Sequence, residues 1–415
     1  MGDSCPHEAP VEGPNQGGTA MDTQIPERAS ASGPPPEPMP GARPVFDKRD
    51  LGQVVLVLQG GGALGAYQAG VYEALDEAGV EPDWVIGTSI GAINAGIIAG
   101  NRPGDRLPRL REFWDRMRHS PAAQLLAGVP GWGAMAANAL TVLGGVPAFF
   151  RPNPWAFLGV PLTPEAAGYY TTAPLEATLR DLIDAEVLSA CATRLTVGAA
   201  NVRTAEMRYF DSRDMALSIR HIMASGALPP AFPAVRIDGE LYWDGGILSN
   251  TPVEAVFDDK PRRSGLVFTV NIWQPDGPEP TDIMQVLSRQ KDLQYASRAK
   301  SQVMRQKQIH RLRHVIAELA RKLPEAERDS EEVRRLAGFG CLTRMHVVRL
   351  LAPAIAGEDH TKDIDFSARG IRGRWEAGYA DTVRVLQQQP WTHRYDPLEG
   401  FILHETEAGA ITSEG

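Results

Sequence analysis

The sequence predicts an α/β fold with parallel strands. Residues 53–58 are a continuous run of apolar, mostly branched residues, which is typical of a strand buried on both faces. A glycine-rich turn, a helix-periodic stretch over 64–78 and a second apolar run at 84–86 follow, so that strand, helix and strand alternate. With 415 residues, 43% of them hydrophobic, the chain is long enough for two or three domains and a sizeable core.

Charge and cysteine content exclude several classes of protein. The net charge of −9 argues against a protein whose whole surface binds nucleic acid. The three cysteines, Cys5, Cys191 and Cys341, form neither a metal-binding pattern nor a disulfide framework, which predicts a reducing, cytoplasmic location. We find no apolar run long enough to span a bilayer and no signal-peptide pattern, and Pro6 stands where a myristoylation signal needs Ser or Thr.

The first 49 residues are expected to be a disordered tail. They are rich in Pro, Gly and Ser, with few large apolar side chains to offset the entropy lost on ordering. A tail that binds a partner is the alternative interpretation.

Residues 101–170 read as an insertion that is first rich in arginine and then in aromatic residues. Two interpretations stand: a lid or acyl-chain surface, or a cap that simply packs on the sheet. The aromatic residues are Trp132, Phe149, Phe150, Trp155, Phe157, Tyr169 and Tyr170.

Further strands and short helices follow. The expected elements are a helix from Thr172, strands at 194–202, 206–211 and 265–271, a short helix from Ser218, and a hairpin that turns at Asp238-Gly239. Thr251 and Glu254 match a capping box, with Pro252 at the first helical position. We expect strand 265–271 to be the last of the sheet.

The candidate nucleophile is Ser89. It lies in Gly87-Thr88-Ser89-Ile90-Gly91, a G-x-S-x-G pattern between an expected strand and a small-residue helical run. In a nucleophile elbow the serine occupies such a tight strand-to-helix turn, and its hydroxyl projects near the positive end of the helix dipole. Gly87 and Gly91 remove side chains that would collide there. An ordinary Gly/Ser turn is the alternative.

The glycine loop before the first helix has two possible functions. Gly60-x-Gly62-x-x-Gly65 matches a dinucleotide-binding fingerprint, but the acid expected at the end of the next strand is missing and Asp83 lies at that strand's other end. Alternatively, the loop forms an oxyanion hole. Its donors would be the backbone N–H groups of Gly60, Gly61, Gly62 and Ala63, with Ile90 contributing.

The candidate base is Asp244. None of the nine histidines has the context of a triad base; His221 is expected on a helix surface or in packing, and His404 in a loop. Asp244 ends an expected strand and is followed by Gly245 and Gly246, which leave its side chain accessible. A carboxylate bonded to serine could accept its proton, although its reference pKa of about 3.9 makes it a weak base. A simple turn is the alternative.

Together these motifs resemble the patatin-like phospholipase family. The loop Gly60–Gly65, the elbow Gly87–Gly91, the stretch 225–233 and the motif Asp244–Gly246 occur in the family's order. The resemblance covers about 52–272 and implies a three-layer α/β/α catalytic domain over 50–272. It implies that Ser89 is the nucleophile and Asp244 the base of a Ser-Asp dyad.

The activity implied by this resemblance is hydrolysis of lipid acyl esters through an acyl-enzyme, without metal or cofactor. Many members carry Arg or Lys where this chain has Leu64, which leaves phosphate anchoring open and makes a phosphate-free ester an alternative substrate. A non-catalytic lipid-binding or scaffold protein and a dinucleotide-dependent oxidoreductase are the alternative functions.

Residues 273–415 are expected to form a mostly helical extension, similar to one in a bacterial subgroup of the family. It would contain a long helix or helical pair over 282–322, a strand at 345–351 and a helix over 371–389. The second half of the long helix is basic, which suggests either peripheral contact with an anionic membrane or a solvated helix face. Its basic residues are Arg298, Lys300, Arg305, Lys307, Arg311, Arg313, Arg321 and Lys322.

Overall fold

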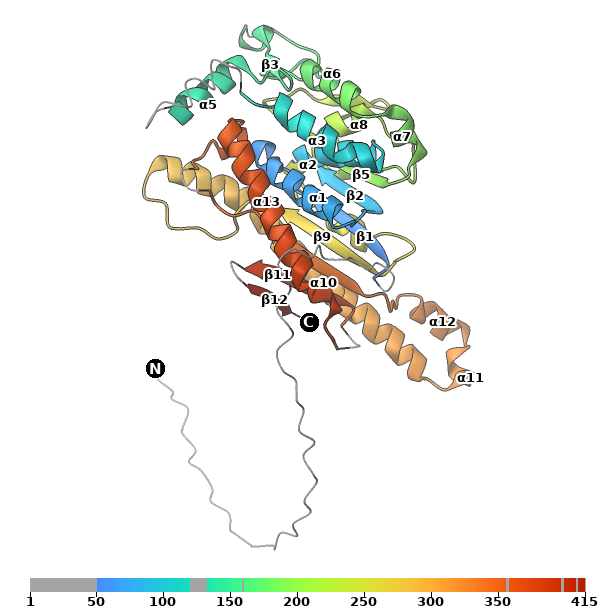
Figure 1. Cartoon of the computed structure of the whole chain (residues 1–415). Helices are drawn as coiled ribbons and strands as arrows, with labels where there is room; N and C mark the ends of the chain where they lie inside the picture. The colour runs from blue at the N-terminus through green and yellow to red at the C-terminus, as the bar shows by residue number, and fades with distance from the viewer. Residues whose placement is uncertain are drawn as a thin grey trace, which may run out of the picture. The chain divides into compact units, whose positions relative to one another are not determined.

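The computed structural model describes residues 51–119, 133–158, 160–355, 358–396, 399–407 and 410–414. The predicted tail over 1–49 lies outside these residues. The centre of the described chain is one ten-stranded sheet in the order β12-β11-β10-β9-β1-β2-β5-β8-β7, with β6 paired to β5. Helices cover both faces of this sheet (Figure 1), so the predicted α/β/α fold is confirmed.

The middle of the sheet is parallel and largely buried. Its strands are β1 (Gln53–Leu58), β2 (Trp84–Thr88), β5 (Arg194–Asn201), β9 (Gly265–Asn271), β10 (Met345–Leu351) and β11 (Phe401–Glu407). All adjacent pairs among them are parallel. Every residue of β2 and β9 is buried, which explains why these strands read as unbroken apolar runs.

The expectation that strand 265–271 ends the sheet is wrong. β10 pairs in parallel with β9, β11 follows, and β12 (Ala410–Glu414) closes this side antiparallel to β11. The described part of the extension therefore continues the sheet of the predicted catalytic domain, because β9 is apolar on both faces and its free edge needs a partner. The described residues, from Leu51 onward, belong to one compact unit.

Antiparallel strands complete the other side of the sheet. β6 (Met207–Asp211) and β8 (Glu240–Asp244) both pair with β5, and β7 (Val235–Ile237) pairs with β8. The predicted hairpin turn is confirmed, since Asp238 and Gly239 both have positive φ, 48° and 86°.

One face of the sheet carries α1 (Ala66–Glu77), α2 (Ile90–Ala99), α3 (Pro103–Arg116) and α13 (Ala368–Gln388). α1 and α13 cross at Gly70 and Gly378, where an added Cβ would lie about 2 Å from a backbone oxygen of the other helix. The backbones of two segments far apart in sequence therefore touch. α8 (Ile219–Ser225) packs on this side through Ile222.

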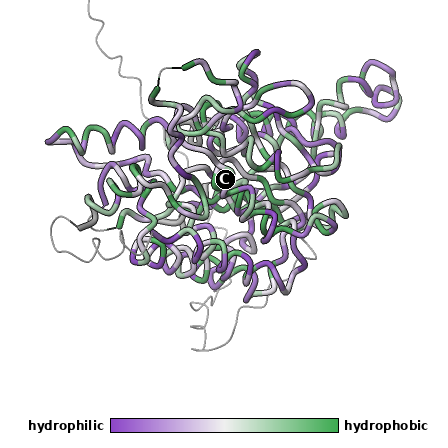
Figure 2. The backbone as a smooth tube through the Cα atoms, turned by 90° about the horizontal axis from the view of Figure 1, so that it is seen from above, coloured by the Kyte–Doolittle hydropathy of each residue, from purple (hydrophilic) through white to green (hydrophobic). Residues whose placement is uncertain are grey.

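The other face carries α9 (Glu254–Phe257) and α10 (Ile283–Lys322). α10 is a single 40-residue helix whose N-cap, Asp282, accepts the Gln285 N–H at 2.9 Å. α11 (Glu325–Arg328) and α12 (Glu331–Ala337) follow it. Together with the end of α10 they form an arm (Figure 1) that is largely hydrophilic (Figure 2). Among the helices described, none combines the length and apolarity needed to cross a bilayer.

The insertion at 101–170 has two roles. Leu110, Phe113 and Trp114 of α3 are fully buried, so α3 belongs to the core. α5 (Gly133–Gly144), the two-residue strands β3 (Arg151–Pro152) and β4 (Tyr170–Thr171), and the short helix η2 (Pro154–Phe157) lie farther out. α6 (Ala173–Leu182) and α7 (Ala185–Ala190) then lead to β5.

Candidate active site

Ser89 occupies a strained turn between β2 and α2. Its φ of 55° and ψ of −125° are costly for a residue with a side chain. An added Cβ would lie 2.3 Å from the Gly91 oxygen if placed on Gly87, and 2.2 Å from the Leu58 oxygen if placed on Gly91. The local backbone has the elbow geometry that the G-x-S-x-G pattern suggests.

Ser225, the last residue of α8, holds this turn in place through its side chain. The backbone N–H of Ser89 donates to Ser225 Oγ at 3.1 Å, and that hydroxyl donates to the Gly198 oxygen at 2.6 Å. Ser225 is fully buried at the end of α8. The sequence placed it in a family-like loop without assigning it this contact.

Asp244 lies at the end of β8, opposite Ala199 of β5, with only 1% of its surface exposed. Its Oδ1 accepts the Gly246 N–H at 2.7 Å, and the Ser89 hydroxyl lies close enough to the carboxylate to lower its pKa. Burial raises the pKa of Asp244 to about 7, against the lowering effect of the Ser89 hydroxyl and the Gly246 N–H. An added Cβ on Gly245 would lie 2.4 Å from the Gly198 oxygen, so glycine lets β8 turn close to β5.

The glycine loop, including η1 (Gly62–Gly65), runs beside Ser89. The structure corrects one expectation: the Gly60 N–H donates to the Asn250 oxygen at 3.1 Å and is not free for an oxyanion. Gly60 instead permits close approach, because an added Cβ would lie 2.9 Å from Ser89 Cβ. Gly61, Gly62 and Ile90 line the same cavity as Ser89.

The available donors are therefore fewer than the sequence suggested. In the described chain, no backbone acceptor pairs with the N–H of Gly61, Gly62 or Ile90. Ala63 is fully buried and is not among the described residues that line the cavity.

A buried glutamine ties the loop to the end of β9. Gln59 Oε1 accepts the backbone N–H of Ile272 at 2.6 Å, and its Nε2 donates to Thr251 Oγ1 at 2.7 Å. The predicted capping box at Thr251 is wrong for this reason: its hydroxyl serves Gln59, and α9 begins only at Glu254. The sequence feature that could have indicated these contacts is a polar residue, Gln59, directly after the apolar run 53–58.

Two further side chains fix the loop, and sequence reasoning missed both. Asn250 Nδ2 donates to the Gly60 oxygen at 3.0 Å, and Trp273 Nε1 donates to the same oxygen at 2.7 Å. Since that carbonyl accepts two hydrogen bonds, the orientation of the Gly60–Gly61 peptide is set.

The extension also reaches the glycine loop. The short helix η4 (Lys362–Ile364) packs against η1, and an added Cβ on Gly62 would lie 2.2 Å from the Asp363 oxygen. Two adjacent ion pairs attach η4 to α10: Lys291 with Asp363 at 2.6 Å, and Asp292 with Lys362 at 2.7 Å. η4 is thereby held over the loop.

The cavity at Ser89 is mainly apolar. Phe149, Phe150 and Tyr170 of the insertion line it, which supports the acyl-chain interpretation of that region, and Phe232 and Phe366 complete the aromatic wall. No histidine is among the described residues that line it.

The two histidines considered in the sequence analysis, His221 and His404, lie away from the cavity. His221 is buried, and its Nδ1 accepts the Ser218 N–H at 3.0 Å as part of the cap of α8. His404, expected in a loop, is a buried residue of β11, stacked on His346 with ring nitrogens 3.1 Å apart.

The glycine loop does not have the features of a dinucleotide site. The space beside Gly62 is occupied by the Asp363 backbone, and the space beside Gly65 by the Ile90 side chain. Asp83 accepts the Val54 N–H at 2.7 Å at the opposite end of the parallel strands. A pyrophosphate therefore finds neither a free glycine surface nor a neighbouring acid.

Comparison with known proteins identifies two matching family models and several curated relatives. The family model of patatin-like phospholipase matches residues 56–257, and a second model, described as patatin phospholipase, matches 293–398. The patatin-like phospholipase domain-containing protein ZK370.4 of Caenorhabditis elegans is 27% identical over 202 residues, covering 48% of this chain and 12% of that protein. Lysophospholipase nte1 of Aspergillus terreus is 26% identical over 262 residues, covering 57% and 14%.

The chain thus spans about an eighth of the length of these curated relatives. Among solved structures, VipD from Legionella pneumophila aligns with 81% of this chain and 67% of its own, at 17% identity and a TM-score of 0.34. The two family models match on both sides of β9, in the part that carries the elbow and in the part that carries η4. On this evidence the chain belongs to the patatin-like phospholipase family.

Proposed function

We propose that this chain is a serine acyl hydrolase of the lipase or phospholipase A type, which cleaves acyl esters of lipids. One observation carries the proposal: Ser89, on a strained turn, lies beside a buried carboxylate, Asp244, at an apolar cavity. Membership of a phospholipase family and relatives named lysophospholipase support a lipid substrate.

In the proposed mechanism, ionised Asp244 accepts the Ser89 proton while Ser89 Oγ attacks the acyl carbon. Negative charge on the carbonyl oxygen is stabilised by the N–H groups of Gly61, Gly62 and Ile90, preset before the reaction. The tetrahedral species collapses, Asp244 returns the proton to the departing alcohol or lysolipid, and an acyl-Ser89 ester remains. Water, deprotonated by Asp244, then releases the fatty acid and regenerates Ser89. No metal or cofactor takes part.

A pKa near 7 suits Asp244 to this role. A carboxylate of ordinary pKa is a poor proton acceptor at neutral pH, whereas catalytic groups work best when their pKa lies near the operating pH. The raised pKa of Asp244 therefore strengthens it as a base and still leaves much of it ionised at neutral pH.

The acyl chain is assigned to the aromatic part of the cavity. Leu64 is buried and uncharged, so a phosphate finds no cation there, and a phosphate-free ester remains a substrate alternative. Assays need both phospholipids and neutral acyl esters.

The test is labelling with a tagged fluorophosphonate, combined with turnover of short- and long-chain esters. We expect both signals for the wild type and for Ser189→Ala, an exposed serine of α7 that serves as matched control. Ser89→Ala should lose both, and Asp244→Asn should lose turnover by about 10²-fold or more. Lipid binding without turnover in the wild type, unchanged in Ser89→Ala, would instead establish a lipid-binding protein, which the apolar cavity also favours.

A further inference from the structure

Large apolar side chains are exposed on the segment that leads to the cavity. We call these side chains of α5, η2 and the neighbouring loops the mouth rim. Its members are Leu140, Leu143, Trp155, Leu158, Val160 and Tyr169. Leu143 is 73% exposed, Leu158 62% and Trp155 61%, which are high values for such residues.

The mouth rim is continuous with the cavity. Thr141 and Val142 of α5 line the cavity, and Val142 is also 46% exposed, so the cavity opens beside Leu140 and Leu143. Tyr170 lines the cavity as well, and its hydroxyl donates to the Val142 oxygen at 2.6 Å.

The other members of the rim are attached to the same wall. β3 pairs with β4, so that Pro152 lies opposite Tyr170, and the Asn153 N–H donates to the Tyr169 oxygen at 2.8 Å. Asn153 also begins η2 and accepts the Trp155 N–H at 3.2 Å. Trp155 and Tyr169 are therefore held in place at one side of the mouth.

This surface contains very little charge. Between residues 133 and 170 the chain has only two charged side chains, Arg151 and Glu165, and Glu165 is ion-paired with Arg236. The rim can therefore be transferred from water to a lipid surface without burying an unpaired carboxylate. The positive charge of Arg151 is compatible with a surface of phosphate headgroups.

We propose that the mouth rim docks on the surface of a lipid aggregate, so that substrate passes from the lipid phase into the cavity without crossing water. The proposal rests on the proposed function and deepens it. Lipid is the occupant the observations favour, because a second copy or a protein partner seated on the rim would cover the opening through which substrate must enter.

The proposal moves membrane contact away from the place the sequence suggested. The basic second half of α10 runs toward the hydrophilic arm that includes α11 and α12, whereas α5 and β3 lie at the other side of the molecule (Figure 1). On that arm Arg321 pairs with Glu318, as expected of a solvated face.

The experiment measures co-flotation of the full chain with phosphatidylcholine vesicles, with and without an anionic phospholipid. The rim variant is Leu143→Ser/Trp155→Ser/Leu158→Ser. The matched control is Leu312→Ser/Leu319→Ser/Phe339→Ser, whose side chains are 61–65% exposed on α10 and after α12. A third variant, Arg305→Gln/Arg311→Gln, reduces the charge of α10.

We expect the rim variant to lose about tenfold or more in vesicle partitioning, since burial of apolar area drives interfacial binding. The control and the α10 variant should bind like the wild type, and all three should turn over a soluble short-chain ester normally. Wild-type-like vesicle binding by the rim variant, or a loss confined to the α10 variant, would overturn the proposal. So would a rim variant that changes only the oligomeric state.

Failure of the proposed function gives a different result. A wild type that hydrolyses the soluble ester but does not float with vesicles refutes docking alone. A wild type that floats through its rim but hydrolyses neither soluble nor vesicle esters refutes the hydrolase.

Discussion

At the scale of single residues, two opposing effects act on the ionisation of Asp244. In the proposed mechanism it must be ionised to accept the proton of Ser89, yet the site that places it beside Ser89 excludes water from it. The charged form is favoured by the neighbouring Ser89 hydroxyl and by the Gly246 N–H, and desolvation outweighs both effects.

The activity should therefore follow the ionisation of Asp244. Because the base form is required, kcat/KM for a soluble, uncharged ester is expected to rise about tenfold per pH unit below pH 7 and to level off above it. The measurement is a pH–rate profile, with folding checked by circular dichroism at each pH. A profile already flat from about pH 5 upward would show that the acceptor keeps an ordinary carboxylate pKa.

The same pKa predicts a stability effect. The folded pKa, about 7, lies above the ordinary value of 3.8, so the native state holds the proton more tightly than the unfolded chain. Stability linked to this proton is complete below about pH 4 and is lost as pH rises to about 7, by ~4 kcal/mol at most at ~1.4 kcal/mol per pH unit. Asp244→Asn, which carries no such charge, should be more stable than the wild type at pH 8 in urea denaturation.

That gain should shrink when the denaturation is repeated at pH 5. An Asn variant that is less stable than the wild type at both pH values would indicate that the carboxylate makes a structural contact the amide cannot replace.

At the scale of elements, the contact of α10 with η4 positions the glycine loop. Two adjacent residues of α10 form ion pairs with η4: Lys291 with Asp363, and Asp292 with Lys362. Because α10 contributes the cation to one pair and the anion to the other, the two pairs set the register of η4. Lys362 lies 5.5 Å from the ring centroid of Trp273, the residue that holds the Gly60 carbonyl.

Reversing one charge should disturb the loop. Asp363→Lys places a second cation against Lys291, and we expect kcat to fall about tenfold or more, as for displaced oxyanion donors. The exchange Lys291→Asp/Asp363→Lys should recover much of that loss, because the attraction is restored. The measurement is kcat and KM separately for one soluble ester.

The corresponding exchange in the exposed pair Glu176 and Arg180 of α6 is the control and should change little. If the double variant on α10 and η4 were no better than Asp363→Lys alone, the ion pair would not be what positions the loop.

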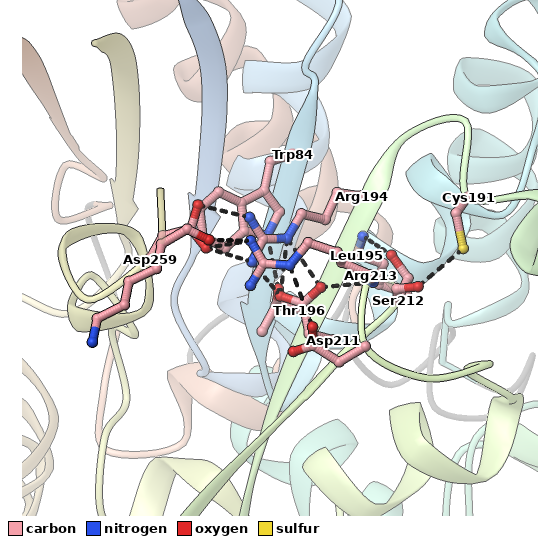
Figure 3. A network of polar contacts seen from close by, with 11 residues as sticks. Trp84, Cys191, Arg194, Leu195, Thr196, Asp211, Ser212, Arg213 and Asp259 are labelled. Carbon is pink, nitrogen blue, oxygen red and sulfur yellow. Dashed lines mark hydrogen bonds and ion pairs between the residues drawn. The ribbon is translucent and has the colours of Figure 1, made fainter. Parts of the chain in front are cut away.

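A second charged cluster stabilises the end of the sheet away from Ser89. Arg194 bonds with Asp211 and Asp259 and stacks on Trp84, 3.6 Å from its ring centroid, as Figure 3 shows. Arg213 also pairs with Asp259, at 2.6 Å. Strands β2, β5 and β6 are thereby joined to the segment before β9.

Asp259→Ala should lower the free energy of unfolding by about 3 kcal/mol, since it leaves the partly buried Arg194 short of an acceptor. Activity per folded molecule should not change, because the cluster lies at the other end of the parallel strands. Asp214→Ala, which removes an exposed partner of Arg213, should cost well under 1 kcal/mol. Equal effects of the two substitutions in thermal and urea unfolding would contradict this assignment.

At the scale of the whole molecule, the fold and the cavity depend on both parts of the chain. β10 covers the edge of β9, and α13 covers α1. Trp273, Tyr295, Asp363 and Phe366, all beyond the first family match, line the cavity.

A chain restricted to residues 51–272 should therefore not fold. It would expose the apolar edge and faces of β9 and one side of α1, and we expect aggregation and no cooperative unfolding transition. Calorimetry of the truncated and full chains makes the comparison. A soluble fragment with a sharp transition and wild-type ester turnover would show that the extension is dispensable.

The sequence by itself determined the features that depend on neighbouring residues. The tight turn at Gly87–Gly91 and the hairpin turn at Asp238-Gly239 follow from backbone sterics, and the structure has both. The α/β class followed from the apolar runs of the strands.

Only the tertiary structure decided what depends on distant partners. It placed β10 beside β9, gave the Gly60 N–H to Asn250 and the Thr251 hydroxyl to Gln59, and enclosed Asp244 so that its pKa rises. The physical reason is the same in each case: strand edges, buried donors and desolvated charges are satisfied by whichever group the folded chain brings to them, and that group lies tens to hundreds of residues away.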